Sequence, residues 1–574
     1  MTAATLATEP ELLGTEYDVV IVGSGYGGAV TAARLGIANA ATGGALRIAV
    51  LERGKEYPTG TFPETQEGAL REVWSSWNPL GLIQIHRNDD IDVLQASGLG
   101  GTSLINFNVA FRPDREVFLH SWPKEFRELV ESDPQGLGGL GEYYERAEAM
   151  LGVIPYADVE PMRRVDVFNK IAEKAGAKVK NLNIAISNDD RVSRYGVERK
   201  KCILHGGDGT GDNSSSKNTL MTNYLPMARH FGVEMHTRVE VDRIHEMSDG
   251  RWRVTGIRRS ESATRSESTT PVELTAARVV LSAGTLGSNG ILMRSRDAGL
   301  DISPRLGKNF SGNGDSFGIA YNTDYRTDTQ AWSTTDVAPR NELRCGPSIN
   351  VAMQFGADQS DLRKRFTVED LSVPRALQDV FRLGLMGLAG LKYPDVNPAR
   401  VNRWRKDIQF NTDGAMNHSL GFLIMVHDNS DGELVLRKDG STGIEWPGAP
   451  TERAYQDVND KLKPAVEAIG GTYIKNPWWA NTLFGNHLLT AHPLGGCAVS
   501  DNVDGGVVDH AGKVFRADGR VHDGLYVIDG SVLPRAIGVN PMLTISMFAE
   551  WAADHLRAEM GLPRYDAESE RDDR

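Results

Sequence analysis

The chain has 574 residues, a formal net charge of −13 and a hydrophobic fraction of 40%. This length exceeds one ordinary hydrophobic core, so we expect two or more domains. The negative charge argues against nucleic acid and anionic membrane surfaces as partners, because both would repel an acidic protein.

The cysteines and the apolar stretches bear on the cellular compartment. Cys202, Cys345 and Cys497 lie far apart and form neither a CxxC pair nor a disulfide framework, which is typical of a reducing compartment. Residues 1–17 lack the basic start, apolar core and twin arginine of an export signal. The longest apolar stretch, Leu383 to Leu391, is too short to cross a bilayer. We therefore expect a cytoplasmic protein with no transmembrane segment, and the oligomeric state stays open.

The first pattern that carries chemistry is a strand, a glycine-rich turn and a helix. Val19 to Val22 read as a buried parallel strand, which runs into GSGYGG with the spacing GxGxxG. Gly23 allows a tight turn, Gly25 lets the backbone approach a pyrophosphate, and Gly28 allows close packing of helix and strand. A second strand ends at Glu52, whose carboxylate can accept hydrogen bonds from a ribose diol. This order predicts an adenine dinucleotide site.

The rest of the chain alternates between two kinds of sequence. Residues 54–96 mix proline, tryptophan and charge, which predicts a long excursion from the first sheet. A second glycine cluster, SGLGGTSLIN, follows at 97–106, and helical patterns lead to a polar, serine-rich loop at 206–218. Residues 278–295 repeat the order of strand, glycine turn and helix, so we expect a later strand of the same sheet.

The remaining residues predict more strands and two sets of helices. Strand-like stretches at 314–489 flank a helical pair expected at 374–406, and a last helix is expected from about 541 to 560. The predicted fold class is α/β, α+β overall, in which a Rossmann-like nucleotide domain is interleaved with a domain of helices and mostly antiparallel sheet. The expected nucleotide domain comprises 1–53, 95–112, 217–313 and 487–574, and the second domain comprises 54–94, 113–216 and 314–486.

The C-terminal part contains two polar residues in unusual positions. His492 lies in an apolar segment directly before Pro493 and a Gly-Gly turn, and Asn540 precedes Pro541 and a helix. A single buried histidine is most often satisfied by a backbone carbonyl, and an Asn-Pro pair before a helix is by default an N-cap. Neither residue alone indicates an active site.

Taken together, the motifs resemble a known family. VGSGYGG with Glu52, GLGGTSLIN, GTLGS, AHPLGGC and LYVIDGSVLPRAIGVNP follow one another between residue 17 and about residue 555. In this order they resemble the glucose–methanol–choline (GMC) oxidoreductases, nearest to the cholesterol oxidase branch. The motifs are specific at the two ends of the chain and sparse in the middle.

The resemblance implies FAD, held non-covalently. The pyrophosphate would lie on Gly23 to Gly28, including Tyr26 and Gly27, the ribose at Glu52, and the adenine at the backbone of Val241. The isoalloxazine would lie between a flavin segment (residues 97–109) and a closing segment (residues 529–542). Their matching positions are Gly100, Gly101, Thr102, Asn106, Phe107, Val109, Asp529, Gly530, Asn540 and Met542.

The resemblance also implies three catalytic residues. His492 would act as base on the substrate hydroxyl, since its unperturbed pKa lies near neutrality, and Asn540 would hold the oxygen while the carbinol hydride passes to flavin N5. Dioxygen or another acceptor would then reoxidise the flavin, with hydrogen peroxide as the product from dioxygen. Glu369 matches a glutamate that moves a proton during steroid isomerisation, although it also fits a surface glutamate beside Asp370. If it is buried, its pKa should rise.

We therefore expect an FAD-dependent oxidase or dehydrogenase for a hydrophobic alcohol, with a 3-hydroxysteroid as the first candidate and a role in steroid metabolism. A long-chain or aryl alcohol, a lyase in which the flavin is structural and His492 only moves protons, and a non-catalytic flavoprotein are the alternatives. An NAD enzyme is disfavoured, because the flavin and closing segments would have no role. No metal-ligand spacing occurs, so no metal is expected.

Two features depart from the family pattern or leave the substrate open. Phe107 and Asn108 stand where relatives often carry a glycine pair or an aromatic residue, and only Cys202 precedes SSSKNTL, where some relatives carry a cysteine cluster. Several apolar residues of the two excursions fit either a substrate mouth or ordinary packing between domains; they are Trp74, Trp77, Leu80, Leu383 to Leu391 and Trp404.

Overall fold

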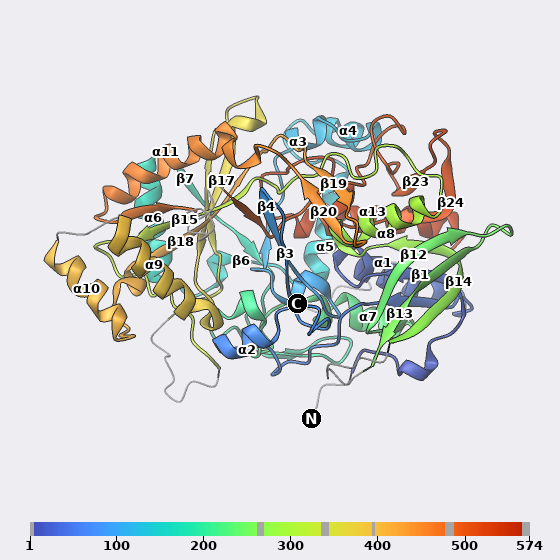
Figure 1. Ribbon diagram of the computed structural model, residues 1–574, viewed down its shortest axis with the longest axis horizontal. Coiled ribbons are helices and arrows are strands. Elements are labelled where there is room, and N and C mark those ends of the chain that lie inside the picture. The colour runs from blue at the N-terminus through green and yellow to red at the C-terminus, as the bar shows by residue number, and fades with distance from the viewer. Residues whose placement is uncertain (1–4, 261–268, 335–343, 393–396, 477–486, 565–574) are drawn as a thin grey trace.

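The computed structural model describes residues 5–260, 269–334, 344–392, 397–476 and 487–564. Figure 1 shows an elongated molecule with two lobes, each built on one large β-sheet. The lobe on the right in Figure 1 carries β1, β14 and the helices α1, α8 and α13, and the lobe on the left carries β15, β17 and β18 with α6 and α11.

The larger sheet contains the N-terminal strand. Its order is β11–β2–β1–β14–β13–β12, with β24 beside β14 and β23 beside β24. The strands β11, β2, β1, β14 and β24 run parallel, whereas β12, β13 and β14 form an antiparallel meander. The bounds are β1 Glu16–Val22, β2 Ile48–Leu51, β11 Glu234–His236, β12 Val239–Glu246, β13 Trp252–Arg259, β14 Thr269–Leu281, β23 Lys513–Phe515 and β24 Val521–Val527.

Four helices lie beside this sheet. α1 (Tyr26–Ala40) packs on α7 (Tyr224–His230) and α13 (Met542–Glu559), and α8 (Gly284–Asp297) packs beside β12. α1 and α13 are buried along most of their length, because small and apolar residues cover all sides of both helices. An ion pair between Arg34 of α1 and Glu550 of α13 is also buried, with Nε and Oε2 2.8 Å apart.

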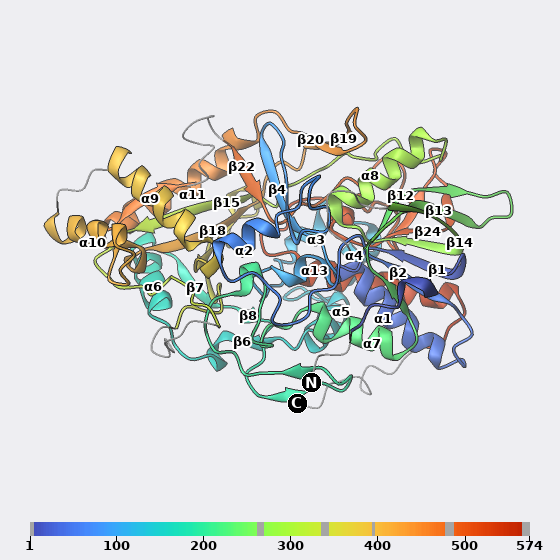
Figure 2. The same cartoon turned by 60° about the horizontal axis from the view of Figure 1, so that its bottom comes forward.

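The second large sheet has six strands and is antiparallel throughout. Its order is β21–β15–β18–β17–β16–β7. α6 (Arg163–Ala175) and α11 (Arg453–Glu467) pack against each other on its outer side (Figures 1 and 2). The bounds are β7 Lys178–Asn181, β15 Asp315–Tyr321, β16 Val351–Phe355, β17 Phe366–Leu371, β18 Leu420–Val426 and β21 Thr472–Lys475.

Smaller sheets and helices complete the fold. β22 pairs in parallel with β4, which forms a hairpin with β3, and β8 pairs with β5 and β6. The bounds are β3 Ile83–His86, β4 Ile91–Ala96, β5 Val109–Ala110, β6 Ile154–Pro155, β8 Asn183–Ile184, β9 Arg191–Val192, β10 Glu198–Arg199, β19 Glu433–Leu436, β20 Thr442–Glu445, β22 Leu488–Thr490, α2 Gln66–Arg71, α3 Glu116–Leu119, α4 Lys124–Glu131 and α5 Leu140–Met150.

The predicted helical pair corresponds to α9 (Gln378–Lys392) and α10 (Pro398–Ile408). Asn397 caps α10, because its side chain accepts a hydrogen bond from the backbone N–H of Ala399 at 3.0 Å, and Pro398 occupies the first turn. Within the described ranges, no helix combines the length and the apolar character needed to cross a bilayer.

The mixed α/β fold that the sequence predicts is confirmed. Every strand of the eight-stranded sheet falls within the segments expected for the nucleotide domain, and every strand of the six-stranded sheet falls within the other segments. β4 crosses the expected boundary between residues 94 and 95. The individual boundaries stay a prediction, and residues 1–4, 261–268, 335–343, 393–396, 477–486 and 565–574 lie outside the described residues.

Candidate active site

The glycine turn after β1 has the geometry that a pyrophosphate site requires. Gly23 has a φ of +97°, and a Cβ there would strike the backbone of Ser282. A Cβ on Gly28 would strike the carbonyl of Gly23, so this glycine allows helix and strand to pack closely. A Cβ on Gly25 would meet nothing within 4 Å, so the backbone at this position borders open space. These three roles are those of a dinucleotide fingerprint.

The start of α1 has free donors for a phosphate group. Gly25 is the N-cap residue and, having no side chain, does not satisfy the first N–H groups of the helix. These N–H groups and the positive end of the helix dipole favour an anion. A Cβ on Gly27 would strike the carbonyl of Ile528, so Gly27 packs against the end of β24.

Glu52 lies at the end of β2 and is 7% exposed. Its Oε2 accepts hydrogen bonds from the Ser24 hydroxyl at 2.6 Å and from the Ser24 backbone N–H at 3.2 Å, while Oε1 accepts from Gly54 N at 2.8 Å. The Ser24 hydroxyl also accepts a hydrogen bond from Gly100 N at 3.0 Å. Ser24 therefore ties the first glycine turn to the flavin segment, a role that the sequence analysis missed.

The predicted adenine position lies next to Glu52. Val241 is buried in β12, directly before a bulge in the pairing with β13. β12 begins where the Val239 N–H donates to the Glu52 carbonyl at 2.9 Å. The structure therefore places Val241 close to the end of β2.

The flavin segment folds back on the start of α1. Gly100 and Gly101 have φ values of +101° and +56°, and a Cβ on Gly101 would lie 2.9 Å from the Gly25 Cα. Thr102 lies in a 3₁₀ turn that ends at Leu104, and Val109 begins β5. Only glycine allows the two turns to approach so closely, so this segment and the first glycine turn form one surface.

Asn106 contacts two other predicted cofactor residues, Tyr26 and Met542. Its Nδ2 donates to the Tyr26 hydroxyl at 2.7 Å and lies 3.4 Å from the Met542 Sδ. Burial raises the pKa of Tyr26, and the hydrogen bond from Asn106 lowers it. The neighbouring Phe107 packs on the apolar core and borders Gly209. The flavin segment, α1 and α13 therefore meet at Asn106.

Asp529 and Gly530 follow the end of β24, where Asp529 caps a short 3₁₀ helix (Gly530–Val532) and bonds to the start of α8. The Asp529 Oδ2 accepts from Gly284 N at 3.0 Å and from the Ser288 hydroxyl at 2.5 Å, and Oδ1 accepts from Ser531 N at 2.9 Å. Burial raises the Asp529 pKa, while these hydrogen bonds lower it. Both carboxylate oxygens are occupied within the protein, so Asp529 shapes the closing segment through its own loop.

His492 is held by a carboxylate from the other sheet. Its Nδ1 lies 2.9 Å from the Asp315 Oδ1, its side chain is 15% exposed, and Asp315 is fully buried at the start of β15. The Asp315 Oδ2 accepts from the Thr490 hydroxyl and the Ala491 N–H, both at 2.9 Å. A neutral imidazole that donates its Nδ1–H to Asp315 keeps Nε2 as a proton acceptor. The sequence analysis missed Asp315, since nothing in the local sequence marks this aspartate.

Asn540 and Glu369 form a buried pair. The Asn540 Nδ2 donates to the Glu369 Oε2 at 3.1 Å, and their relative exposures are 5% and 0%. Among the residues that the structure describes, the Oδ1 of Asn540 and the Oε1 of Glu369 have no hydrogen-bond partner. α13 begins at Met542 without a side-chain cap, so the default prediction that Asn540 caps this helix is wrong. Two buried polar atoms without partners indicate a place where a ligand binds.

The environment of Glu369 favours its neutral form. Burial raises its pKa well above the ordinary value, the carboxylates of Asp370 and Asp315 raise it further, and the hydrogen bond from Asn540 lowers it. The adjacent Asp370 points to the other face of β17, where it forms an ion pair with the fully buried Arg164, the Nε and Oδ2 being 2.8 Å apart. The prediction of an inward-facing Glu369 in a buried strand agrees with this placement, and its catalytic role stays a prediction.

The register of the antiparallel sheet explains why two carboxylates share one face. Asp315 and Thr367 both pair with Met425 across β18, and Glu369 follows Thr367 by two residues. Residues opposite each other, and residues two apart on one strand, point to the same face of a sheet. Asp315 and Glu369 therefore approach His492 and Asn540 from one surface, although no hydrogen bond links His492 to Asn540 among the described contacts.

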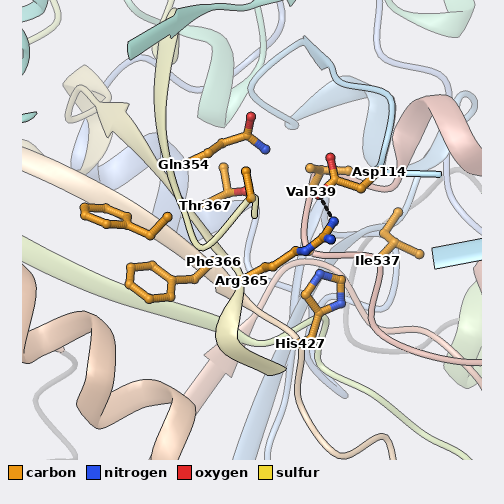
Figure 3. A pocket seen from close by; sticks show the side chains of 11 residues that line it. Asp114, Gln354, Arg365, Phe366, Thr367, His427, Ile537 and Val539 are labelled. Carbon is orange, nitrogen blue, oxygen red and sulfur yellow. Dashed lines mark hydrogen bonds and ion pairs between the residues drawn. The ribbon is translucent and has the colours of Figure 1, made fainter. Parts of the chain in front are cut away.

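A small cavity borders this surface (Figure 3). It has a volume of about 10 Å³, which is enough for one water molecule. Gln354 and Thr367 line it from the sheet, and Val539 lines it from the closing segment. His427 lies at its edge, where burial and the nearby Arg535 and Arg365 lower its pKa to about 4. The lining also carries an ion pair, in which the Arg365 Nη1 lies 2.9 Å from the Asp114 Oδ2.

The apolar residues that fit a substrate mouth fall into two groups, one packed in the interior and one exposed to solvent. Trp404 and Leu385 pack in a separate apolar cluster with Tyr321, and Leu80 is buried. Trp77 and Leu383, by contrast, are 72% and 60% exposed. Among the residues that the structure describes, no three His, Cys, Asp or Glu side chains are grouped closely enough to hold a metal ion.

The site combines a parallel sheet and two glycine turns with a half-buried histidine and two buried carboxylates. These features together define a nucleotide-cofactor oxidoreductase. The chain belongs to the GMC oxidoreductase family, whose sequence pattern matches residues 17–313 and residues 457–549. The family that the motifs predict is thereby confirmed. It is a flavoprotein family, usually FAD-binding, whose members act on alcohol-type donors.

Two kinds of relatives match most of the chain. A cholesterol oxidase of Mycobacterium tuberculosis (strain ATCC 25618 / H37Rv) is 27% identical over 94% of this chain and 90% of its own length. The long-chain-alcohol oxidase FAO4B of Arabidopsis thaliana is 24% identical over 93% of this chain and 66% of its own length. The solved structure of pyridoxine 4-oxidase from Mesorbium loti superposes with a TM-score of 0.58 at 16% identity, over 94% of this chain and 99% of that structure, which supports the fold alone.

Proposed function

We propose that the protein oxidises a hydrophobic secondary or primary alcohol to the carbonyl compound, with non-covalently bound FAD. The observation that carries this proposal is the pairing of His492 with Asp315 on the same sheet face that presents Glu369 to Asn540. When bound, FAD supplies the hydride acceptor and passes the electrons on to dioxygen or another acceptor.

Three residues would act on the substrate hydroxyl. The His492 Nε2 removes the hydroxyl proton, and Asp315 holds the ring and stabilises the imidazolium that forms. Asn540 donates to the substrate oxygen through the second N–H of its Nδ2, since the first is donated to Glu369. As the proton leaves, the carbinol carbon releases its hydride, so the alcohol loses two electrons and becomes a carbonyl.

The cofactor would be held by the residues around the glycine turns. The free N–H groups of α1 would bind the pyrophosphate, and Glu52 would accept hydrogen bonds from the ribose beside Val241. At one end of the site, the open space at Gly25 leaves room for a bound group. At the other end, the Oδ1 of Asn540, which has no hydrogen-bond partner among the described residues, can accept a hydrogen bond from such a group. The start of α13 would favour negative charge on the flavin.

A 3-hydroxysteroid is our first candidate substrate, supported by the cholesterol oxidase relatives and by Glu369. A neutral Glu369 can give a proton to one carbon of an unsaturated ketone after its base form has removed one from another, which shifts a double bond without redox change. A long-chain alcohol is the second candidate, since a relative of that activity matches 93% of the chain.

A flavin-bleaching screen tests the proposal. The purified protein is mixed without oxygen with sterols, long-chain alcohols and aryl alcohols, and flavin absorbance and hydrogen peroxide after aeration are measured. We expect bleaching by at least one class and loss of bleaching in His492→Ala. No bleaching by any class would support the lyase alternative, and bleaching by aliphatic alcohols alone would exclude the steroid candidate.

A further inference from the structure

Lys217 is a buried amine that the proposed reaction does not use. It is 3% exposed and lies in the loop 206–218, in the SSSKNTL stretch. Its Nζ donates hydrogen bonds to three backbone carbonyls, those of Leu104 at 3.1 Å, Asn106 at 2.6 Å and Asp208 at 2.9 Å. Two of these carbonyls belong to the flavin segment.

The three acceptors match the three N–H bonds of an ammonium group. A lysine ammonium has three donors and no acceptor, so each N–H finds one carbonyl. A neutral amine would have only two donors and would turn its lone pair towards a carbonyl oxygen. Burial lowers the Lys217 pKa to about 7, while the carboxylates of Asp208 and Asp212 oppose this shift. These hydrogen bonds therefore favour a charged ammonium group next to the flavin segment, with a carbonyl acceptor for each of its N–H bonds.

The hydrogen bond to the Asn106 carbonyl connects Lys217 to the predicted flavin residues. The side chain of the same residue donates to the Tyr26 hydroxyl and lies against the Met542 sulfur. The carbonyl and the amide belong to one residue, so moving the backbone at 104–106 would move the amide. No other described side-chain donor bonds the carbonyls of Leu104 and Asn106.

We propose that Lys217 is a positioning residue for the flavin segment, in which its ammonium group holds residues 104–106 so that the Asn106 amide stays against Tyr26 and Met542. The part of this inference that concerns the flavin depends on the proposed function. The part that concerns the backbone depends only on the three hydrogen bonds. Lys217 acts through Asn106 and takes no part in the proton transfers.

Lys217→Met tests the proposal, with Asn218→Ala as the matched control. Asn218 is also 3% exposed and is the next residue, but its side chain donates to the Gly152 carbonyl at 2.8 Å and accepts from Arg199, and no hydrogen bond described for it reaches the flavin segment. Backbone hydrogen exchange is measured for peptides covering 98–107 in the purified proteins. We expect at least tenfold faster exchange there in Lys217→Met and no change in Asn218→Ala.

The flavin gives a second readout that a purely structural role would not move. We expect Lys217→Met to retain FAD through the unchanged turn at Gly23 to Gly28, but to show a shifted visible flavin band and a kcat at least tenfold lower with a similar KM. Lys217→Gln, which keeps two donors, should fall between Lys217→Met and the parent protein, and it replaces Lys217→Met if that variant does not fold.

Two results would overturn the proposal. One is unchanged exchange at 98–107 and an unchanged flavin band in both Lys217 variants. The other is the same changes in Asn218→Ala, which would show general loosening of the loop. If the parent protein binds no flavin, the proposed function fails, but the exchange comparison still decides whether Lys217 holds the segment.

Discussion

The two ends of the candidate site are built in different ways. The nucleotide end comes from one continuous stretch, β1, the glycine turn, α1 and β2, closed by Glu52. The alcohol end takes Asp315 from β15, Glu369 from β17, His492 from the segment after β22, and Asn540 from the segment before α13. The first therefore depends on local backbone geometry, and the second on the docking of two sheets.

This difference predicts how each end responds to change. At the nucleotide end, backbone N–H groups would do the binding, so a side chain placed at Gly25 would enter the space in which they meet the pyrophosphate. At the alcohol end, each polar side chain has a separate partner and a separate task, so single substitutions should affect turnover and leave cofactor binding intact.

The largest effect should come from removing the base. We expect His492→Ala to lower kcat by roughly 10²- to 10⁴-fold, the usual contribution of a positioned acid–base group, with FAD content unchanged. Steady-state kinetics and the flavin spectrum measure both. His418→Ala is the control, because the hydrogen bond described for its ring is to the Thr323 carbonyl, from Nδ1 at 3.2 Å. Normal turnover in His492→Ala would exclude it as the base.

Asp315→Asn tests whether the base needs its buried carboxylate. A hydrogen bond to a charged group contributes about 1.5–3 kcal/mol, so we expect kcat to fall roughly 10- to 100-fold. Steady-state kinetics measure this fall, and FAD content should stay unchanged, because Asp315 bonds to His492, Thr490 and Ala491. An unchanged kcat would show that Asp315 only supports the fold.

Gly25→Ala tests the nucleotide end. A methyl group would occupy the space beside the N-terminus of α1, and loss of about one charge-assisted hydrogen bond should weaken FAD binding roughly tenfold. Reconstitution of the apoprotein with FAD measures the affinity. Gly141→Ala is the control, since a Cβ there also meets nothing within 4 Å. Equal affinities in the two variants would place the pyrophosphate elsewhere.

The smallest effect concerns the stability of the buried acid. The folded-state pKa of Glu369 is raised, so the folded protein binds more protons than the unfolded chain above the ordinary glutamate pKa, and stability falls as pH rises through this window. Glu369→Gln removes this dependence. We expect the free energy of unfolding of Glu369→Gln, measured by urea unfolding relative to the parent, to increase with pH in this window. The increase should be at most about 1.4 kcal/mol per pH unit. If the difference in unfolding free energy between Glu369→Gln and the parent did not change with pH, Glu369 would be ionised in the folded protein.

Much of the fold could be predicted because its signals are local. The apolar stretch at Val19 to Val22 lies in β1, and the repeat at 278–295 contains the end of β14, which pairs with β1 in parallel. The glycine spacing corresponds to the turn between β1 and α1. The expected helical pair at 374–406 is present as α9 and α10. Strand pairing over long distances was not predictable, and neither was the assembly of β22 with β4.

The candidate site was predictable only in part. His492, Asn540 and Glu369 could be named because they match family motifs, but their partners could not. Asp315 lies 177 residues from His492 in the chain, and no spacing rule connects them. Lys217 likewise reads as an ordinary charged residue of a polar loop until its burial and its three carbonyl partners are known.

By itself, the sequence determined where a dinucleotide can bind, because a strand, three glycines and a terminal acid shape that surface within one continuous stretch. Only the tertiary structure decided which side chains share the alcohol end. The register of β15, β18 and β17 turns Asp315 and Glu369 to one face, and the docking of the sheets brings them against His492 and Asn540. Burial then sets the protonation of Glu369, because a carboxylate without solvent loses the hydration that its charge requires.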